Sequence, residues 1–172
     1  MAAHAKKQGD PTEKPGVVGA FCKIYDVPAA IDKFIPEVYT PAGQGRYTFA
    51  AGSTTGGVVL YDDGAFSYSH HGTDPASGQL VNAFDLIRLH LFSDKDEDMQ
   101  PGTLVTKLPS YKAMTELVLA DPEASYQLAL DRIGDSFDDL ENSDEIDTEW
   151  MRDLDKTDKG LFRSTINNYT LI

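Results

Sequence analysis

The chain has 172 residues, a formal net charge of −13 at pH 7 and a pI of about 4.5. This acidity argues against a protein that simply wraps nucleic acid, because such proteins carry a basic stripe. The length suits one domain, or one domain with a substantial appendage, and 41% hydrophobic and 25% charged residues are near the averages of globular proteins.

The cysteine content and the lack of long apolar runs limit the compartments in which the protein can work. The single cysteine, Cys22, excludes an internal disulfide and a zinc site built from cysteine pairs. It lies in an apolar run, so a packed core thiol is expected. No apolar run approaches the ~20 residues of a membrane span, and residues 1–15 lack the apolar core of a signal peptide. We therefore expect a cytoplasmic protein that makes no contact with a membrane.

The first elements are predicted to be two short helices behind a flexible lead. Residues 17–25 carry apolar side chains at helical spacing. Asp26 is a good N-cap for a second helix, because Pro28 stands in its first turn, where a missing N–H costs nothing. Pro36 ends that helix.

A small antiparallel meander is predicted from Arg46 to His70. Residues 46–50 and 65–69 alternate aromatic with small side chains, and residues 58–61 form a strongly β-branched strand. The dipeptide Asp63-Gly64 supplies the positive φ angles of a tight primed turn. In the last strand, Phe66 and Tyr68 share one face, and Ser67 and Ser69 share the other.

The glycine-rich loop at residues 52–57 is predicted to be a strand connector. It lacks the Gly-Lys-Ser/Thr of a phosphate cradle, and a strand follows it rather than a helix.

The densest polar cluster is Ser-His-His-Gly-Thr-Asp at residues 69–74. Adjacent histidines on a strand point to opposite faces and do not chelate a metal easily. The surrounding sequence contains nothing that would position a serine as the nucleophile of a Ser-His-Asp triad. Three readings stay open: a metal site, a hydrogen-bonding or phosphate-contacting loop, or a loop that locks the meander to the next helix through Asp74, Pro75 and Asn82.

The remaining elements are predicted to be helices. Asn82 caps a helix over residues 82–92, with Asp85 at its third position. Further helices are predicted to start at Pro109, Asp121, Asp147 and Ser164, and the second of these carries Tyr126, Leu130, Ile133 and Phe137 at helical spacing.

Acidic residues concentrate in the C-terminal part, from Asp121 to Asp158. The run over 135–147 indicates either a solvated face or a contact with a basic partner surface.

These patterns predict an α+β fold, in which a small antiparallel meander packs with short helices and an acidic helical tail follows. We expect a flexible lead over 1–15, a core domain over 16–95, a linker over 96–107 and a helical region over 108–172. The apolar end, Thr-Leu-Ile, suggests that a further C-terminal domain follows.

The string YDDGAFSYSHHGTDPASGQLVNAFDLIRLH resembles the middle region of phage and prophage proteins of the virulence-associated protein E family. So do KKQGDPTEKPGVVGAFCKIY before it and LPSYKAM and KGLFRSTINNYTLI after it, so the resemblance covers nearly the whole chain. In that family a primase-polymerase-like module precedes this region and a P-loop helicase-type ATPase follows it. The resemblance implies DNA replication in a bacterial host cell. The chain itself has neither a primase's paired acids nor a Walker lysine, so no catalysis by it is implied.

A weaker similarity is to the zinc ribbon of bacterial primases, in which a short sheet leads into a capped helix. The chain lacks every cysteine ligand of that ribbon, so the likeness implies a metal-free version in which aromatic packing replaces the zinc.

The resemblance and the polar cluster together predict a non-catalytic, cofactor-free module of a phage-type primase-helicase. Its expected partners are the neighbouring primase and ATPase domains and single-stranded or template DNA, with Tyr68 as a stacking platform. Two alternatives remain: a protein-interaction or structural spacer domain without nucleic-acid binding, which the net charge favours, and a metal-dependent hydrolase centred on His70, His71 and Asp74. The predicted DNA-contacting residues are Arg46, Tyr68, Ser69, His70, His71, Thr73 and Arg88.

Overall fold

A computed structural model describes residues 8–141, with side chains described through residue 133. Contacts within the chain separate residues 1–133 from residues 134–172, and only residues 134–141 of the second unit are described. The helices predicted from Asp147 and Ser164 lie outside the described residues, as do the first residues of the lead.

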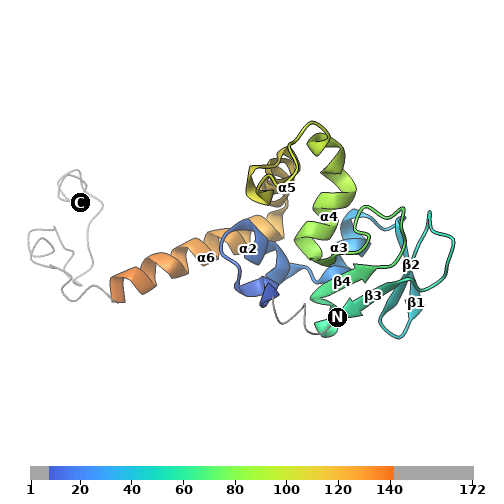
Figure 1. The fold of residues 1–172 in the computed structure, drawn as a ribbon. Helices are drawn as coiled ribbons and strands as arrows, with labels where there is room; N and C mark the ends of the chain where they lie inside the picture. Colours follow the sequence, from blue (N-terminus) through green and yellow to red (C-terminus); the bar gives the residue numbers. More distant parts are fainter. Residues whose placement is uncertain (1–7, 142–172) are drawn as a thin grey trace, which may run out of the picture. The chain divides into compact units, whose positions relative to one another are not determined.

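The fold is α+β, as predicted, and its sheet is an antiparallel meander of five strands (Figure 1). The strands follow one another in space in the order of the sequence, and each neighbouring pair is antiparallel. The strands are β1 (Tyr39–Gly43), β2 (Arg46–Phe49), β3 (Val58–Tyr61), β4 (Phe66–Ser69) and β5 (Leu80–Asn82).

The sequence predicted the three central strands but missed β1 and β5. Strand β1 contains Pro41 and Gly43, which weaken a strand signal but are tolerated because β1 is an edge strand. Strand β5 has only three residues before Asn82 caps the next helix, which is too short for a visible alternation.

Two predicted helix caps are present with the expected geometry. Asp26 Oδ1 accepts a hydrogen bond from Ala29 N at 2.8 Å, and Asn82 Oδ1 accepts one from Asp85 N at 2.9 Å. The helices are α2 (Val17–Ile24), α3 (Val27–Phe34), α4 (Ala83–Phe92), α5 (Pro109–Ala120) and α6 (Pro122–Glu141). Short 3₁₀ turns are η1 (Pro11–Glu13), η2 (Asp62–Gly64), η3 (Ser93–Asp96) and η4 (Val105–Lys107). None of the helices that the structure describes is long and apolar enough to cross a bilayer.

The turn between β3 and β4 is wider than the tight hairpin predicted for Asp63-Gly64. Tyr61 pairs with Phe66, so four residues form the loop. Asp62, Asp63 and Gly64 all have positive φ, at 49°, 52° and 95°. The Asp-Gly signal therefore predicted the backbone conformation correctly and the loop length wrongly.

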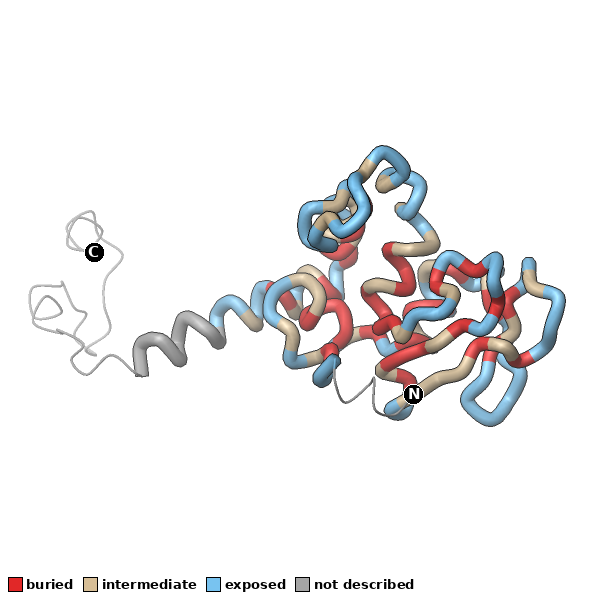
Figure 2. The backbone as a smooth tube through the Cα atoms, viewed as in Figure 1, coloured by how far each residue is buried: buried red, intermediate tan, exposed pale blue. Residues whose placement is uncertain are grey.

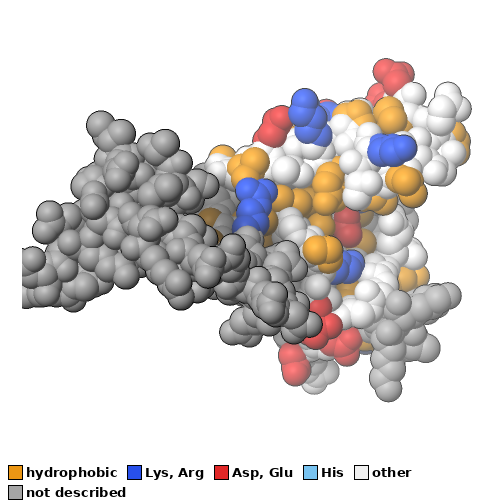
Figure 3. Space-filling model, turned by 90° about the vertical axis from the view of Figure 1, so that its left-hand side faces the viewer, with side chains coloured by type: hydrophobic (Ala, Val, Ile, Leu, Met, Phe, Trp, Pro, Cys, Tyr) orange, Lys and Arg blue, Asp and Glu red, His pale blue; other side chains and the backbone are white. Residues whose placement is uncertain are grey.

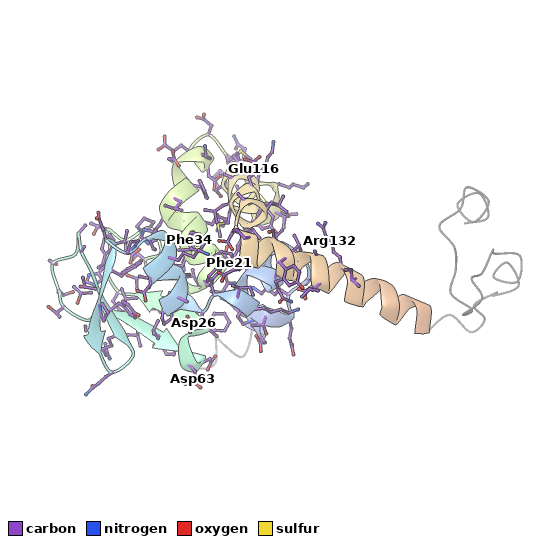
Figure 4. All side chains as sticks on the ribbon, turned by 180° about the vertical axis from the view of Figure 1, so that it is seen from behind. Phe21, Asp26, Phe34, Asp63, Glu116 and Arg132 are labelled. Atoms are coloured by element: carbon purple, nitrogen blue, oxygen red, sulfur yellow. The ribbon has the colours of Figure 1, made fainter. Side chains whose placement is uncertain are left out.

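The hydrophobic core lies where helices α2 to α5 meet one side of the sheet. Figure 2 shows the buried segments running through these helices and along the strands. Phe21 of α2 and Phe34 of α3 pack against each other, with their ring centroids 5.6 Å apart (Figure 4). Burial raises the pKa of the Cys22 thiol to about 11, as expected for a packed thiol. The largest fully buried side chains of the helices include Phe21, Ile31, Phe84, Leu86, Ile87 and Met114.

Candidate nucleic-acid interface

A row of four paired residues crosses the sheet on its open face. Arg46 of β2 pairs with Val59 of β3, Val59 pairs with Tyr68 of β4, and Tyr68 pairs with Leu80 of β5. Residues that are paired directly in antiparallel strands project from the same face. All four are exposed or half-buried, so this row, which we call the open row, faces away from the core.

The neighbouring row projects from the other face. Tyr47 pairs with Val58 and Val58 with Ser69, and all three are buried. Helix α3 lies behind the sheet in Figure 1 and in front of it in Figure 4, which is drawn from the opposite side. Helix α3 therefore covers the face opposite the open row. The face of the open row is only partly open, because Phe66, two residues before Tyr68, is 2% exposed and Gln8 Nε2 donates to the carbonyl of Leu80 at 2.9 Å.

His70 extends the open row at the end of β4. It follows Tyr68 by two residues, it is exposed, and the two rings meet edge to face with centroids 4.8 Å apart. Arg46 Nη1 donates to the carbonyl of Gly56 at 3.1 Å, and the side chain stays exposed. Thr73 is exposed in the turn after His70.

The open row is free of exposed acidic residues, although the chain is strongly acidic. Residues 38–61 contain no Asp or Glu. Residues 64–84 contain one, Asp74, which is only 4% exposed. Arg46 is thus the charged side chain of the four-residue open row, and the nearest acidic residues beyond β3 in the sequence are Asp62 and Asp63.

Three of the predicted contact residues are buried and do not belong to the open row: Ser69, His71 and Arg88. Arg88 donates from Nε to Asp85 at 3.1 Å and from Nη1 to Ser110 at 2.9 Å, and it lies 3.8 Å from Asp96. It therefore joins α4 to α5 and cannot reach a ligand on the sheet. Asp96 also accepts from Ser110 N at 2.8 Å, so the segment predicted as a linker starts at a residue tied to the core.

His71 is enclosed by the glycine-rich loop. A Cβ at Gly52 would stand 2.5 Å from its Nδ1, and a Cβ at Gly57 would stand 2.4 Å from its Nε2. Only glycine leaves room for the ring at these two positions, which accounts for both glycines in what is otherwise a strand connector. Thr54 Oγ1 lies 3.4 Å from Nδ1, and Nε2 has no hydrogen-bond partner among the residues described.

Asp74 ties the sheet to helix α4 from inside the fold. Its Oδ2 accepts from the Tyr39 hydroxyl at 2.8 Å, and its Oδ1 lies 3.2 Å from Nε2 of His90. The Tyr39 hydroxyl is 2.7 Å from the same Nε2, and Ala76 N donates to Oδ1 at 2.8 Å. Together, Tyr39, Asp74 and His90 form what we call the sealed cluster. The polar loop thus locks the meander to the helix through Asp74, one of the roles that the sequence left open.

The hydrogen bonds of the sealed cluster decide the ionisation of Asp74. Burial alone would raise its pKa, but hydrogen bonds from His90, Ser69, Ala76 N and Tyr39 outweigh burial and lower the pKa below its ordinary value. Burial beside this carboxylate raises the pKa of the Tyr39 hydroxyl. Asp74 is therefore held as an anion, and its oxygens are occupied by structural partners.

Sequence reasoning missed the roles of Tyr39 and His90. Tyr39 stands in an unrecognised edge strand, and His90 lies far from it in sequence. Their contact depends on how α4 packs on the sheet, so no local pattern could have shown it.

The described part of the chain contains no group of three or more His, Cys, Asp or Glu side chains placed to hold a metal ion. His70 is exposed and His71 is buried, so the two rings that follow β4 do not share one environment. Comparison with family models, curated proteins and solved structures found no match for this chain. The open row thus carries one guanidinium, two aliphatic side chains and, with His70, an aromatic pair, and none of its residues is acidic.

Proposed function

We propose that this chain is a non-catalytic connecting and DNA-contacting module of a phage-type primase-helicase that acts in DNA replication in the cytoplasm of a bacterial host. The resemblance of the 61–90 string to the virulence-associated protein E family supports the replication role. In this proposal, the neighbouring primase and ATPase domains of the parent protein perform the chemistry, and this module holds template strand between them.

The open row carries the proposal. Tyr68 and His70 offer aromatic faces on which bases can stack whatever their sequence, and Arg46 offers a charge to the backbone phosphates. Thr73 adds a hydroxyl at the edge. The contact surface that we propose therefore comprises Arg46, Tyr68, His70 and Thr73, and omits Ser69, His71 and Arg88, because these three are buried.

The net charge limits the affinity. At −13 the whole chain repels a polyanion, so binding through one guanidinium should be weak and limited to the open row. A contact with about one phosphate predicts a shallow salt dependence, with log affinity against log salt falling with a slope of about −0.7 on single-stranded DNA.

Fluorescence anisotropy of a labelled oligothymidine, titrated with the full chain at several salt concentrations, tests the proposal. Tyr68→Ala should weaken binding by about 5- to 150-fold, because one stacked base contributes ~1–3 kcal/mol. Tyr68→Phe keeps the ring and should bind like the parent chain.

A matched pair of charge variants tests the placement of the surface. Arg46→Ala should weaken binding and reduce the salt slope by about 0.7, since it removes one phosphate contact. Lys95→Ala removes the same charge from an exposed position in η3 and should leave both quantities nearly unchanged. If the two variants behave alike, DNA is not bound at the open row. If the parent chain shows no binding at low salt, the spacer alternative replaces the proposal.

A further inference from the structure

The η4 turn and the start of helix α5 line a groove of about 500 Å³, which we call the α5 groove. Residues 106–109 line it together with three residues of α5, Tyr111, Lys112 and Thr115. Leu108 and these three α5 residues are spaced by three, one and three positions, so they lie on one face of the helix start. The groove is therefore formed by a single continuous segment of the chain.

Hydrogen bonds to the body of the protein hold the start of α5 in place. Arg88 Nη1 donates to Ser110 Oγ at 2.9 Å, and Ser110 N donates to Asp96 Oδ1 at 2.8 Å. The half-buried ring of Tyr111 packs on the core ring of Phe84, with centroids 5.4 Å apart. Since Asp96 already occupies a free N–H group at this end of the helix, an anion in the α5 groove depends on side chains and not on the helix terminus.

The two lysines of the α5 groove are without a carboxylate partner. Lys107 and Lys112 are both exposed, and neither forms an ion pair among the residues described. By contrast, Lys23 and Lys33 each lie 2.7 Å from an aspartate oxygen. The chain has 28 acidic and 15 basic residues, so two neighbouring unpaired lysines are unexpected on its surface.

Acidic residues are absent from this stretch of the sequence. Residues 99–115 contain no Asp or Glu. Glu116 follows in α5 (Figure 4), but it does not line the groove and forms no ion pair with Lys112 in the described structure. The acidic residues of the 94–98 segment do not line the groove either. The α5 groove is thus a basic site on an acidic chain.

Apolar side chains accompany the two positive charges. Leu104 and Val105, directly before the groove, are 64% and 45% exposed, and Leu108, Pro109 and the Tyr111 ring belong to its lining. Figure 3 shows Lys or Arg side chains beside hydrophobic ones in the upper part of the molecule, at the height at which Figure 1 draws α5. A ligand that fills the groove therefore needs both apolar groups and negative charge.

We propose that the α5 groove binds a short acidic segment of a partner protein. Apolar side chains of that segment enter the groove, as in other grooves that bind peptides, and its carboxylates meet Lys107 and Lys112. A DNA backbone could use the two lysines, but it would leave Leu104 and Val105 in water. This proposal goes beyond the DNA contact at the open row and does not depend on it, because the two surfaces share no residue.

Fluorescence anisotropy of a short labelled peptide in which glutamate and leucine alternate, titrated with the full chain, tests the proposal. Lys107→Ala/Lys112→Ala should weaken binding by about 2- to 30-fold, because two exposed ion pairs are lost. Leu104→Ser/Val105→Ser should weaken it by at least about threefold, because less apolar area is buried. Peptides with glutamine for glutamate, or serine for leucine, should bind more weakly to the parent chain.

Two control variants match these changes outside the α5 groove. Lys14→Ala/Lys95→Ala removes the same charge, and Leu130→Ser changes a leucine of α6 that is 43% exposed. Both should bind the peptide like the parent chain, and circular dichroism should show the same helical content for all variants. Equal losses in the groove and control variants would overturn the proposal, as would a parent chain that does not bind the peptide.

Other occupants of the α5 groove would also overturn the proposal. If unlabelled oligothymidine displaces the peptide, the groove is a nucleic-acid surface. If peptide affinity falls as the protein concentration rises, and sedimentation equilibrium shows a dimer over the same range, a second copy of the chain fills the groove. The DNA proposal is tested with other variants, Arg46→Ala and Tyr68→Ala, so either proposal can fail alone.

Discussion

Two clusters in this molecule join a tyrosine hydroxyl to a carboxylate and a basic nitrogen, and they differ in their access to water. In the sealed cluster, the side chains of Asp74 and His90 are 0% and 6% exposed. The second, which we call the surface cluster, consists of Tyr25, Lys33, Asp121 and Glu123. There, Lys33 and Glu123 are 39% and 65% exposed, and only Asp121, at 6%, is buried.

The surface cluster is as closely connected as the sealed one. The Tyr25 hydroxyl shares its one proton between Glu123, at 2.6 Å, and Asp121, at 2.9 Å, and Lys33 Nζ lies 2.7 Å from Asp121. Burial and the hydrogen bond to Glu123 raise the pKa of Tyr25 to about 12. The comparison of the two clusters indicates that short hydrogen-bond distances alone do not determine how much a cluster contributes to the free energy of unfolding. Water screens the charges of the surface cluster and can solvate a group whose partner has been removed. In the sealed cluster, water can do neither.

Asp74→Ala should have the largest effect on stability. It leaves the Tyr39 hydroxyl and the His90 ring in the interior without their shared acceptor, and breaking a buried pair costs about 3–5 kcal/mol. Urea unfolding followed by circular dichroism measures this change. Asp98→Ala removes an exposed carboxylate with no ion pair in the described structure and should change the free energy of unfolding by less than about 0.5 kcal/mol. Similar losses in both variants would show that the sealed cluster contributes nothing special.

Acid should remove the contribution of the same carboxylate. The pKa of Asp74 is lower in the folded chain than its ordinary value, so the folded state favours the anion. Its contribution is complete above the unfolded pKa of about 3.9 and is lost as the pH falls through the folded pKa. The gap in unfolding free energy between the parent chain and Asp74→Ala should therefore be constant from neutral pH to about pH 5 and narrow at lower pH. A constant gap down to pH 2 would contradict the lowered pKa.

Gly57→Ala should destabilise the chain by about 1–3 kcal/mol, because the new methyl group overlaps the enclosed ring of His71. Gly72→Ala is the control, since a Cβ there meets nothing within 4 Å. Thermal unfolding of both variants measures the difference. Adding His71→Ala to Gly57→Ala should cost less than the sum of the two single changes, because the overlap is then gone. Additive losses would place the cost of Gly57→Ala elsewhere.

Features that depend on neighbours in sequence were predictable, and features that depend on packing were not. The caps at Asp26 and Asn82 were predicted because each cap bonds a residue three positions away. The sealed cluster was not, because its members come from β1, the 70–78 loop and α4. Its geometry follows from the way in which the sheet and α4 meet, which no local pattern records.

Strand β4 shows why the candidate site was only partly predictable. Alternation correctly placed Ser69 on the face opposite Tyr68, but polarity did not tell which face was buried. Ser67 and Ser69 are 1% and 2% exposed, whereas Tyr68 is half-buried on the open side. Small polar side chains enter a core when they find hydrogen bonds, as Ser69 Oγ does from His71 N at 3.3 Å. The predicted surface therefore mixed residues from both faces.

Helix α6 shows the same limit. The large apolar residues Tyr126, Leu130 and Ile133 stand at helical spacing, yet it is Ala124 and Leu128 that enter the core. Periodicity identifies an apolar face but not which of two apolar faces the body of the protein covers.

Asp121→Ala should cost about 1–2 kcal/mol, less than Asp74→Ala. Asp121 caps α6, with its Oδ1 accepting from Ala124 N at 2.9 Å, and it also holds Tyr25 and Lys33. Asp121→Ser keeps a capping oxygen and removes the charge, so it separates the two contributions. If the surface cluster is largely screened, Asp121→Ser should recover most of the loss in denaturant unfolding. If Asp121→Ser is as unstable as Asp121→Ala, the interactions of Lys33 and Tyr25 with the carboxylate contribute more to stability than their exposure implies.

Lys23→Ala should have the smallest effect, at about 0–1 kcal/mol. Lys23 Nζ lies 2.7 Å from Asp131 Oδ1, but the two side chains are 40% and 21% exposed. Gln127 Nε2 donates to the same Oδ1 at 2.8 Å, so Asp131 keeps a partner when the lysine is removed. The loss should shrink further as salt is added, since exposed pairs are screened, whereas the loss in Asp74→Ala should persist at the same salt. Unfolding of both variants at low and high salt measures this contrast, and an equal salt response would mean that the sealed cluster is open to water after all.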